Sequence, residues 1–175
     1  AERKVLHTSS GRTGTDPAPF SLGRDTEGDV LEFGGVARFR ITRSRIHCQA
    51  PARFPSSIIQ ALLLGPAMAF WLERAGVAAL HASAVCVGTR AVGVLSFSTG
   101  GKSTLAAGLV RRGHPLLADD LLAVERRGNG FVVRPGFPSI RLWSDVARHF
   151  VDRWEDLERI EHKGDKRRVP IGAGG

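Results

Sequence analysis

The sequence predicts an α/β fold, α+β at its N-terminal end, in which a mixed sheet is flanked by helices. Three observations carry this prediction. Apolar and polar residues alternate between positions 30 and 48, which is typical of antiparallel strands. An apolar run at 91–97 passes through a small polar loop into a helical pattern at 102–112. A further apolar run, 115–118, ends directly in two aspartates.

The N-terminal part divides into a polar stretch and a patterned one. Residues 1–28 are rich in Gly, Ser, Thr and Pro and show little periodicity, so we expect a flexible lead-in there. We expect residues 29–175 to form one domain, shortened at its C-terminus because the chain stops in "VPIGAGG" just after a strand-like start. Within this domain, "VLEFGGVARFRITRSRIHCQA" predicts two or three antiparallel strands.

A long apolar segment follows these strands. Residues 58–75 predict a helix that is capped by Ser56 or Ser57, kinked at Pro66 and ended by Gly76. Its content of Ala, Leu, Ile and aromatic residues favours a largely buried position.

The rest of the chain predicts paired strands and two further helices. The runs "HASAVCVG" and "AVGVLSF" predict strands joined by a tight turn at 88–90. Residues 102–112 predict a helix closed by Gly113. Its apolar face comprises Leu105, Ala106, Leu109 and Val110. "HPLLADDLLAVE" and "GFVVRPG" predict strands joined by a turn at 127–130, and "SDVARHFVDRWEDLERI" predicts a helix capped by Ser144. The side chains expected to point inward from that helix are Val146, Phe150, Val151 and Trp154.

Composition disfavours several classes of partner. The chain has 175 residues and a net charge of +8, with 25 lysines and arginines that form no basic stripe interleaved with aromatics, so we expect no nucleic-acid partner. A basic surface favours an acidic partner, either a nucleotide or a peptide. Cys48 and Cys86 lie in strand-like apolar surroundings, which predicts buried thiols in a reducing compartment. No signal peptide is visible, and Arg74 interrupts the best apolar run before the ~18 residues of a membrane span, so we expect a cytoplasmic protein without a membrane partner.

The most informative stretch is "VLSFSTGGKSTL", residues 94–105. It matches the end of the phosphate-loop pattern Gly-x-x-x-x-Gly-Lys-[Ser/Thr], whereas Ser96 stands at the first glycine position. A phosphate loop needs a strand, a tight turn that gathers backbone N–H groups, and a helix N-terminus, and this order is present here. The expected nucleotide-binding residues are Ser98, Thr99, Gly100, Gly101, Lys102, Ser103 and Thr104. The alternative is a strand-to-helix turn with a chance Gly-Lys-Ser.

Two further features belong with this loop. Asp119 and Asp120 end the next strand, where one carboxylate can hold Mg²⁺ and a second can orient or deprotonate an acceptor hydroxyl. An Asp-Asp pair favours transfer to a substrate over hydrolysis; the alternative is a solvated turn. His81 precedes the strand "ASAVCVG" and is a candidate neighbour of the γ-phosphate, although a lone histidine at a strand start is more often structural.

Together, "HASAV", the loop at 96–104 and "RGHPLLADD" at 112–120 resemble the HPr kinase/phosphorylase family of bacterial serine kinases. The resemblance covers residues 79–125 and continues more loosely through "RPGFPSIRLWSD", as in the diverged HPr-kinase-like proteins. Some of those occur in lasso-peptide pathways, where they phosphorylate a serine of the precursor peptide. The resemblance implies a P-loop kinase core of the HPr kinase and phosphoenolpyruvate carboxykinase type, ATP and Mg²⁺ as cofactors, and a homo-oligomer.

The resemblance also implies roles for single residues. Lys102 would hold the phosphates and Ser103 the Mg²⁺, His81 would lie near the transferring phosphate, and we favour Asp119 as the catalytic base with Asp120 as the metal ligand. The chain departs from the family where Ser96 and Thr99 occupy glycine positions. At a position with positive φ, a residue other than glycine is strained by roughly 1 kcal/mol. We interpret Lys166 and Arg167 as a solvated basic turn; a late cationic contact to phosphate is the alternative.

The sequence therefore predicts an ATP-dependent, Mg²⁺-requiring kinase that transfers the γ-phosphate to a serine hydroxyl of a peptide or small protein. Two alternatives stay open. One is a small-molecule kinase on the same core, because no acceptor-binding signature is visible. The other is a non-catalytic nucleotide-binding or sensing domain, which the residues in the glycine positions of the loop favour.

Overall fold

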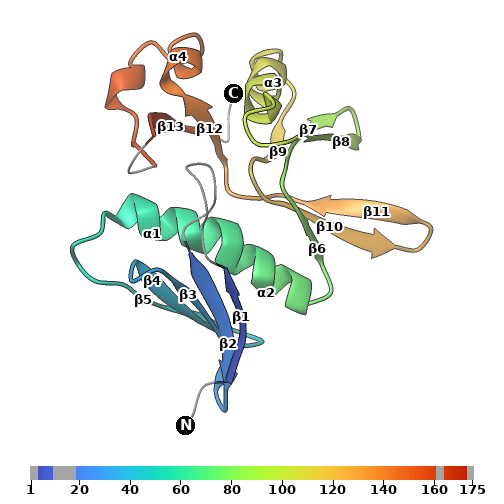
Figure 1. Ribbon diagram of the computed structural model, residues 1–175. Helices are drawn as coiled ribbons and strands as arrows, with labels where there is room; N and C mark the ends of the chain where they lie inside the picture. Colours follow the sequence, from blue (N-terminus) through green and yellow to red (C-terminus); the bar gives the residue numbers. More distant parts are fainter. Residues whose placement is uncertain (1–3, 10–18, 161–163, 173–175) are drawn as a thin grey trace. The chain divides into compact units, whose positions relative to one another are not determined.

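The computed structural model describes residues 4–9, 19–160 and 164–172. It is a mixed α/β structure with antiparallel sheets and few helices (Figure 1). The chain divides into two compact units, residues 1–75 and 76–175. The expectation of a single domain beginning at residue 29 differs from this division because each unit has hydrophobic clusters of its own.

The first unit is built on a five-stranded antiparallel sheet. Its strands follow one another in the order of the sequence: β1 (Lys4–Ser9), β2 (Phe20–Asp25), β3 (Gly28–Phe33), β4 (Ala37–Ile41) and β5 (Ile46–Gln49). The strands predicted over 30–48 are thus confirmed as β3, β4 and β5. Residues 4–9 and 20–25 differ from the expected flexible lead-in, because β2 pairs with β3 along its whole length and β1 pairs with β2. Residues 10–18 lie outside the described residues.

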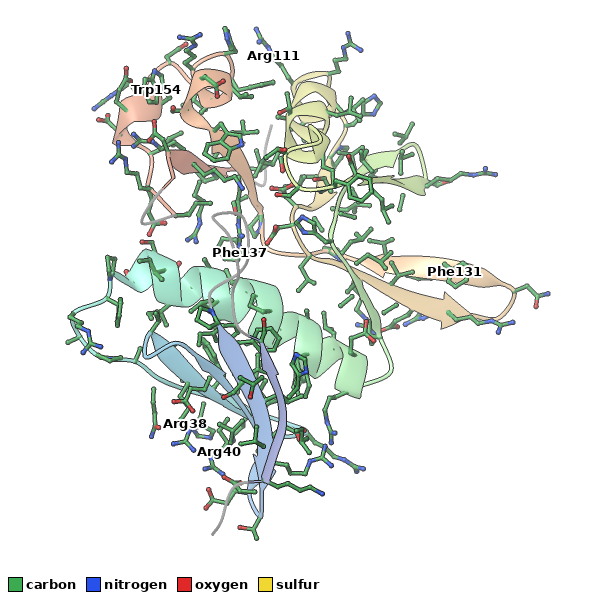
Figure 2. The ribbon with its side chains drawn as sticks, in the orientation of Figure 1. Arg38, Arg40, Arg111, Phe131, Phe137 and Trp154 are labelled. Atoms are coloured by element: carbon green, nitrogen blue, oxygen red, sulfur yellow. The ribbon has the colours of Figure 1, made fainter. Side chains whose placement is uncertain are left out.

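The two faces of this sheet differ in chemistry. Phe33 and Phe39 are buried on one face, with their rings in edge-to-face contact. Arg38 and Arg40 alternate with these apolar residues along β4 and lie on the opposite face (Figure 2). Arg40 forms an ion pair with Asp25 at 2.7 Å. The period of two along β4 therefore separates buried apolar side chains from arginines.

A helical segment covers the apolar face of this sheet (Figure 1). It consists of α1 (Ser56–Leu62), a π-helical turn η1 (Leu63–Ala67) and α2 (Met68–Arg74). Pro66 lies in the π turn, whose wider hydrogen-bond spacing accommodates a residue without an N–H. The expected serine cap is wrong, because Pro55 is the N-cap and no side chain caps the helix. The expectation of a largely buried helix is also wrong, since most of its side chains are only partly buried.

The same segment meets the length and composition of a membrane-spanning helix. Its 19 residues, Ser56–Arg74, have a mean hydropathy of 1.3, and Arg74 is the last residue rather than an interruption. Only 11% of this stretch is buried, and Phe70 and Trp71 are among the residues that pack against the core of this unit.

The cysteines differ from their expected burial. Cys48, on the edge strand β5, is exposed, and Cys86, near the end of β7, is half-buried. Both are free thiols. Cys48 is exposed because β5 is the edge strand of its sheet, which an apolar neighbourhood in the sequence does not reveal, and Cys86 lies one residue before the end of β7.

The second unit contains small antiparallel sheets. One has the order β8-β7-β9, a second β11-β10-β6, and a third pairs β12 with β13. The bounds of these strands are β6 (Ala78–Leu80), β7 (Ala82–Val87), β8 (Arg90–Leu95), β9 (Leu116–Ala118), β10 (Leu122–Arg127), β11 (Gly130–Arg134), β12 (Ser139–Trp143) and β13 (Lys166–Pro170). The two predicted strand pairs, β7–β8 and β10–β11, are confirmed. The expected mixed sheet is not seen, because every strand pair in the described residues is antiparallel.

Helix α3 (Lys102–Arg111) follows the loop after β8, as predicted, and Gly113 ends it with φ of 88°. Ala106 and Ala107 are its buried apolar residues, and the helix contacts β7 and β12. Leu105, expected on the apolar face, is instead half-exposed. Small side chains on the inner face allow the helix to approach both strands closely.

The predicted helix over 144–160 is wrong. Only α4 (Ser144–Ala147) and a 3-10 turn, η2 (Trp154–Asp156), form there. Leu157 is extended, with ψ of 143°, and the buried guanidinium of Arg167 donates to the carbonyls of Glu155 and Leu157 at 3.1 and 3.0 Å, which holds the chain here outside a helix. The side chains predicted to point inward nevertheless do so, since Val146, Phe150, Val151 and Trp154 all pack against the local core.

Candidate functional site

The topology brings two short chain segments together at one point of the second unit. Ala84 pairs with Ala118 in one sheet, and Leu80 pairs with Leu122 in another. Both segments therefore pass from one sheet into the other at the same place. This sets residues 81–83 opposite residues 119–121. His81 and the two aspartates meet for this reason.

The loop after β8 ends at the same edge. Strands β8 and β9 are each antiparallel to β7 and lie on its two sides, so they run parallel to one another. Their C-terminal ends consequently lie together where β7 begins. Strand β7 separates β8 from β9, and the loop and the two aspartates nevertheless lie at the same edge of the sheet.

The loop has the backbone geometry of an anion cradle. Thr99 has φ of 66° and Gly101 has φ of 79°, and α3 starts immediately afterwards. Left-handed residues among right-handed ones turn backbone N–H groups into a common concavity, and a helix N-terminus adds partial positive charge. Thr99 thus occupies the strained conformation expected of a residue in a glycine position.

Ser96 replaces the first glycine without backbone strain, because its φ is not positive. Its side chain packs against Gly100: a Cβ on Gly100 would lie 1.9 Å from the Ser96 hydroxyl oxygen. The side chain of Ser96 therefore fills the space beside Gly100 that a glycine at position 96 would leave open. Gly100 cannot carry a side chain while Ser96 is present.

Lys102 lies at the start of α3 and is buried, with 7% of its surface exposed. Its ammonium donates to the carbonyls of Ser96 and Phe97 at 2.9 and 3.0 Å. An ammonium has three N–H donors, so one is left for a phosphate oxygen above the loop. The two carbonyls hold the charge beside the concavity.

Asp119 accepts hydrogen bonds at both carboxylate oxygens. Its Oδ1 receives the hydroxyls of Ser83 at 2.6 Å and Ser103 at 2.8 Å, and its Oδ2 receives the backbone N–H of Arg141 at 2.8 Å. Three donors fix its orientation toward the first turn of α3. This position suits a carboxylate beside a metal ion better than one that must take up a proton.

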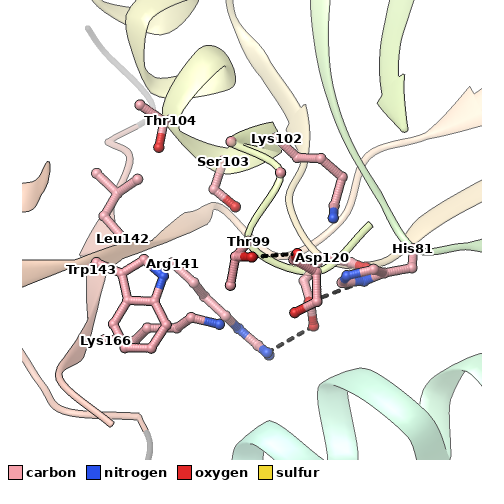
Figure 3. Close-up of a pocket in the computed structure, with 13 residues that line it drawn as sticks. His81, Thr99, Lys102, Ser103, Thr104, Asp120, Arg141, Leu142, Trp143 and Lys166 are labelled. Atoms are coloured by element: carbon pink, nitrogen blue, oxygen red, sulfur yellow. Dashed lines mark hydrogen bonds and ion pairs between the residues drawn. The ribbon is translucent and has the colours of Figure 1, made fainter. Parts of the chain in front are cut away.

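Asp120 points into the pocket instead. Its φ is 75°, and Thr99 and Asp120 are the two described residues other than glycine with positive φ. Its carboxylate lies 3.3 Å from Nδ1 of His81 and 2.7 Å from the guanidinium of Arg141 (Figure 3). Nδ1 of His81 also lies 3.0 Å from the Asp120 carbonyl, which can only accept, so Nδ1 carries the proton. Strained backbone at two positions of one pocket is typical of functional sites.

Strands β12 and β13 complete the pocket. Trp143 is paired with Lys166 across these strands, and the ammonium of Lys166 lies 5.0 Å from the centre of the indole ring. Lys166, expected in a solvated basic turn, lies instead in β13 and lines the pocket, and Arg167, on the other face of the strand, is buried. The lining residues are His81, Ser98, Thr99, Gly100, Gly101, Lys102, Ser103, Thr104, Asp120, Arg141, Leu142, Trp143 and Lys166.

Every residue predicted for the site therefore lies in or beside one pocket, with Asp119 just behind its lining. Sequence reasoning missed Arg141 and Trp143. A signal was present in "SIRLW", where Ile140 and Leu142 are apolar and buried, while Arg141 and Trp143 alternate with them on the opposite face.

The arrangement suits a phosphorylated ligand with a hard cation. Three cationic side chains, from Lys102, Arg141 and Lys166, surround a backbone cradle. The described residues hold no cluster of three or more His, Cys, Asp or Glu that would chelate a metal alone. Mg²⁺ is usually held by one or two carboxylates together with substrate phosphates, and the Ser103 hydroxyl and Asp119 carboxylate supply such oxygens.

Comparisons of the chain with protein-family models, with curated proteins and with solved structures give no match.

Proposed function

We propose that this protein is an ATP-dependent, Mg²⁺-requiring kinase that phosphorylates a serine hydroxyl of a peptide or small protein. The observation that carries the proposal is the hydrogen bond between the Ser103 hydroxyl and Asp119, directly after Lys102 at the head of α3. A lysine, a following hydroxyl and a carboxylate from a neighbouring strand are the parts that hold the phosphates and Mg²⁺ in P-loop enzymes.

The finer fold assignment belongs to this proposal. We infer a P-loop kinase core of the HPr kinase type, supported by the order β8, loop, α3 and by β9 ending beside the loop. The resemblance of "HASAV" and "RGHPLLADD" to that family supports it as well, since His81 and Asp120 line one pocket and Asp119 is hydrogen-bonded to Ser103 at its edge.

The contacts favour the reverse of the aspartate roles inferred from the sequence. Asp119 would hold Mg²⁺ together with Ser103, because its oxygens already face that hydroxyl. Asp120 would take the proton of the acceptor, because its carboxylate is partly exposed in the pocket. Bound Mg²⁺ would neutralise charge on the phosphates.

In the transfer step, the acceptor oxygen forms a bond to the γ-phosphorus while the bond from that phosphorus to the bridging oxygen of ADP breaks. The hydroxyl proton passes to the carboxylate of Asp120. His81 and Arg141 hold this carboxylate from two sides, and Lys102 donates to a phosphate oxygen as charge moves toward ADP.

The test is to incubate the protein with Mg²⁺ and isotopically labelled ATP, together with either a serine-containing peptide library or a metabolite extract. Mass spectrometry then identifies any phosphorylated product. The proposal expects label on peptide serines, absent with Lys102→Ala. Label on metabolites would instead support the small-molecule kinase.

A non-catalytic nucleotide sensor is the second candidate. The specific observation in its favour is that Arg141 neutralises Asp120, the carboxylate that faces the pocket. Nucleotide binding without any labelled product in either pool would establish this alternative.

A further inference from the structure

Trp143 is an aromatic side chain left open inside a polar pocket. It lies two residues after Arg141 on β12, and alternate residues of a strand project from the same face. Ile140 and Leu142, on the other face, are 1% and 2% exposed, whereas Trp143 is 39% exposed. Tryptophan side chains are on average among the more buried ones. A partly exposed indole that lines a pocket therefore indicates a surface on which a ligand binds.

Arg141 and Trp143 mark two ends of the pocket. The guanidinium of Arg141 reaches Asp120, and the Cα atom of Trp143 lies about 6.6 Å further along the strand than that of Arg141, at about 3.3 Å per residue. Figure 3 shows Trp143 and Lys166 on the side of the pocket away from His81. The two ends also differ chemically, because one holds a carboxylate and an imidazole and the other an aromatic ring and an ammonium.

A phosphate loop binds its ligand in one direction. The lysine reaches the β- and γ-phosphates, so the transferring end lies at Lys102, beside Asp120 and His81. The α-phosphate and the nucleoside must then extend the other way, past the first turn of α3, where Thr104 lines the pocket. Trp143 and Lys166 line the part of the pocket that remains.

We propose that Trp143 and Lys166 form the nucleoside end of this site, where the indole stacks on the base and the ammonium pairs with the α-phosphate. The inference rests on the proposed function and adds the residues that hold the base and the α-phosphate, and with them the means by which the site prefers a nucleoside triphosphate to an inorganic polyphosphate. Stacking on an aromatic ring is tolerant of base identity because every base has a π face. Selection among bases is therefore expected to be weak.

The test compares Mg²⁺–ATP with Mg²⁺–tripolyphosphate, which lacks base and ribose. Trp143→Ala is expected to weaken ATP binding about tenfold to hundredfold and to leave tripolyphosphate binding unchanged. Trp143→Phe keeps a stacking ring and should retain most of the affinity. Lys166→Ala should weaken the binding of both ligands. Addition of ATP, but not tripolyphosphate, should quench tryptophan fluorescence in the wild type and not in Trp143→Phe.

The outcomes separate this inference from the proposed function. If the wild type binds ATP and Trp143→Ala binds it equally well, the nucleoside end is elsewhere while the phosphate site stands. If Trp143→Ala weakens the binding of both ligands equally, the indole supports the loop and does not contact a base. The inference is then wrong. If the wild type binds neither ligand, both the inference and the proposed function fail. Trp71→Phe, which alters the first unit, is the matched control for fluorescence.

Discussion

The hydroxyl of Ser103 donates a 2.8 Å hydrogen bond to the carboxylate of Asp119. The first residue lies in the first turn of α3 and the second follows β9, so the bond joins the loop helix to the strand that returns from it. Because Asp119 also accepts from Ser83 on β7, one carboxylate ties together three elements that surround the loop.

The two neighbouring aspartates should respond differently to the same substitution. Asp119→Asn should weaken Mg²⁺–ATP binding about tenfold to hundredfold, because an amide cannot replace a carboxylate beside the metal. Asp120→Asn should keep the binding and lower the transfer rate by roughly 10²- to 10⁴-fold. Calorimetry and a single-turnover transfer assay measure the two effects. The opposite pattern would restore the roles inferred from the sequence.

Arg141 should act as a positioning residue for Asp120. Arg141→Ala removes one of the three cationic side chains of the pocket but keeps the backbone N–H that donates to Asp119, so ATP affinity should fall less than the transfer rate does. The transfer rate should fall about five- to tenfold, as expected for loss of a partly exposed ion pair of about 1 kcal/mol. Arg141→Lys should restore part of the rate. An unchanged rate in Arg141→Ala would show that Asp120 needs no such partner.

Thr99 should be a strained residue whose replacement by glycine is tolerated. Its φ of 66° costs a β-branched residue roughly 1 kcal/mol, which Thr99→Gly relieves. Thr104→Gly, in the first turn of α3, is the matched control and should lower the free energy of unfolding by about 1 kcal/mol. Urea unfolding of the two variants measures this contrast. Equal destabilisation by both would mean that the left-handed conformation carries no strain.

Much of the second unit was predictable because its signals are local. A two-residue turn between apolar β-branched runs specifies the β7–β8 hairpin, and Gly113 ends α3 as expected. The loop residues and both aspartates were found from their types and spacing. The sequence did not reveal which of the two aspartates faces the pocket, because the φ of 75° that turns Asp120 into it depends on tertiary contacts.

Other errors have a common physical cause. Strands β1 and β2 are polar and poorly periodic, and they form because β3 offers a partner along its length. The amphipathic pattern after Ser144 predicts a helix, but Arg167 from a later strand takes the carbonyls of Glu155 and Leu157. In both cases a distant segment overrides a local preference.

Stability should fall in acid partly through Asp165, which precedes β13. The Ser144 hydroxyl, and then Arg167, hold the pKa of Asp165 below its ordinary value of 3.8. A carboxyl whose pKa is lower in the folded state stabilises the fold above pH 3.8, and this contribution is lost as the pH falls through the folded-state pKa. Ser144→Ala should therefore destabilise the protein near neutral pH, with a difference from wild type that shrinks in acid. Urea unfolding between about pH 6 and about pH 3 measures this. A difference that stays constant with pH would contradict it.

Calorimetric titration with ATP, with and without Mg²⁺, tests the central claim most directly. The account predicts that the wild type binds ATP in a Mg²⁺-dependent manner and that Lys102→Ala, checked to be folded by thermal unfolding, binds it at least about thirtyfold more weakly. A wild type that does not bind Mg²⁺–ATP, or a Lys102→Ala variant that binds it equally well, would contradict the assignment of residues 96–104 as a phosphate loop.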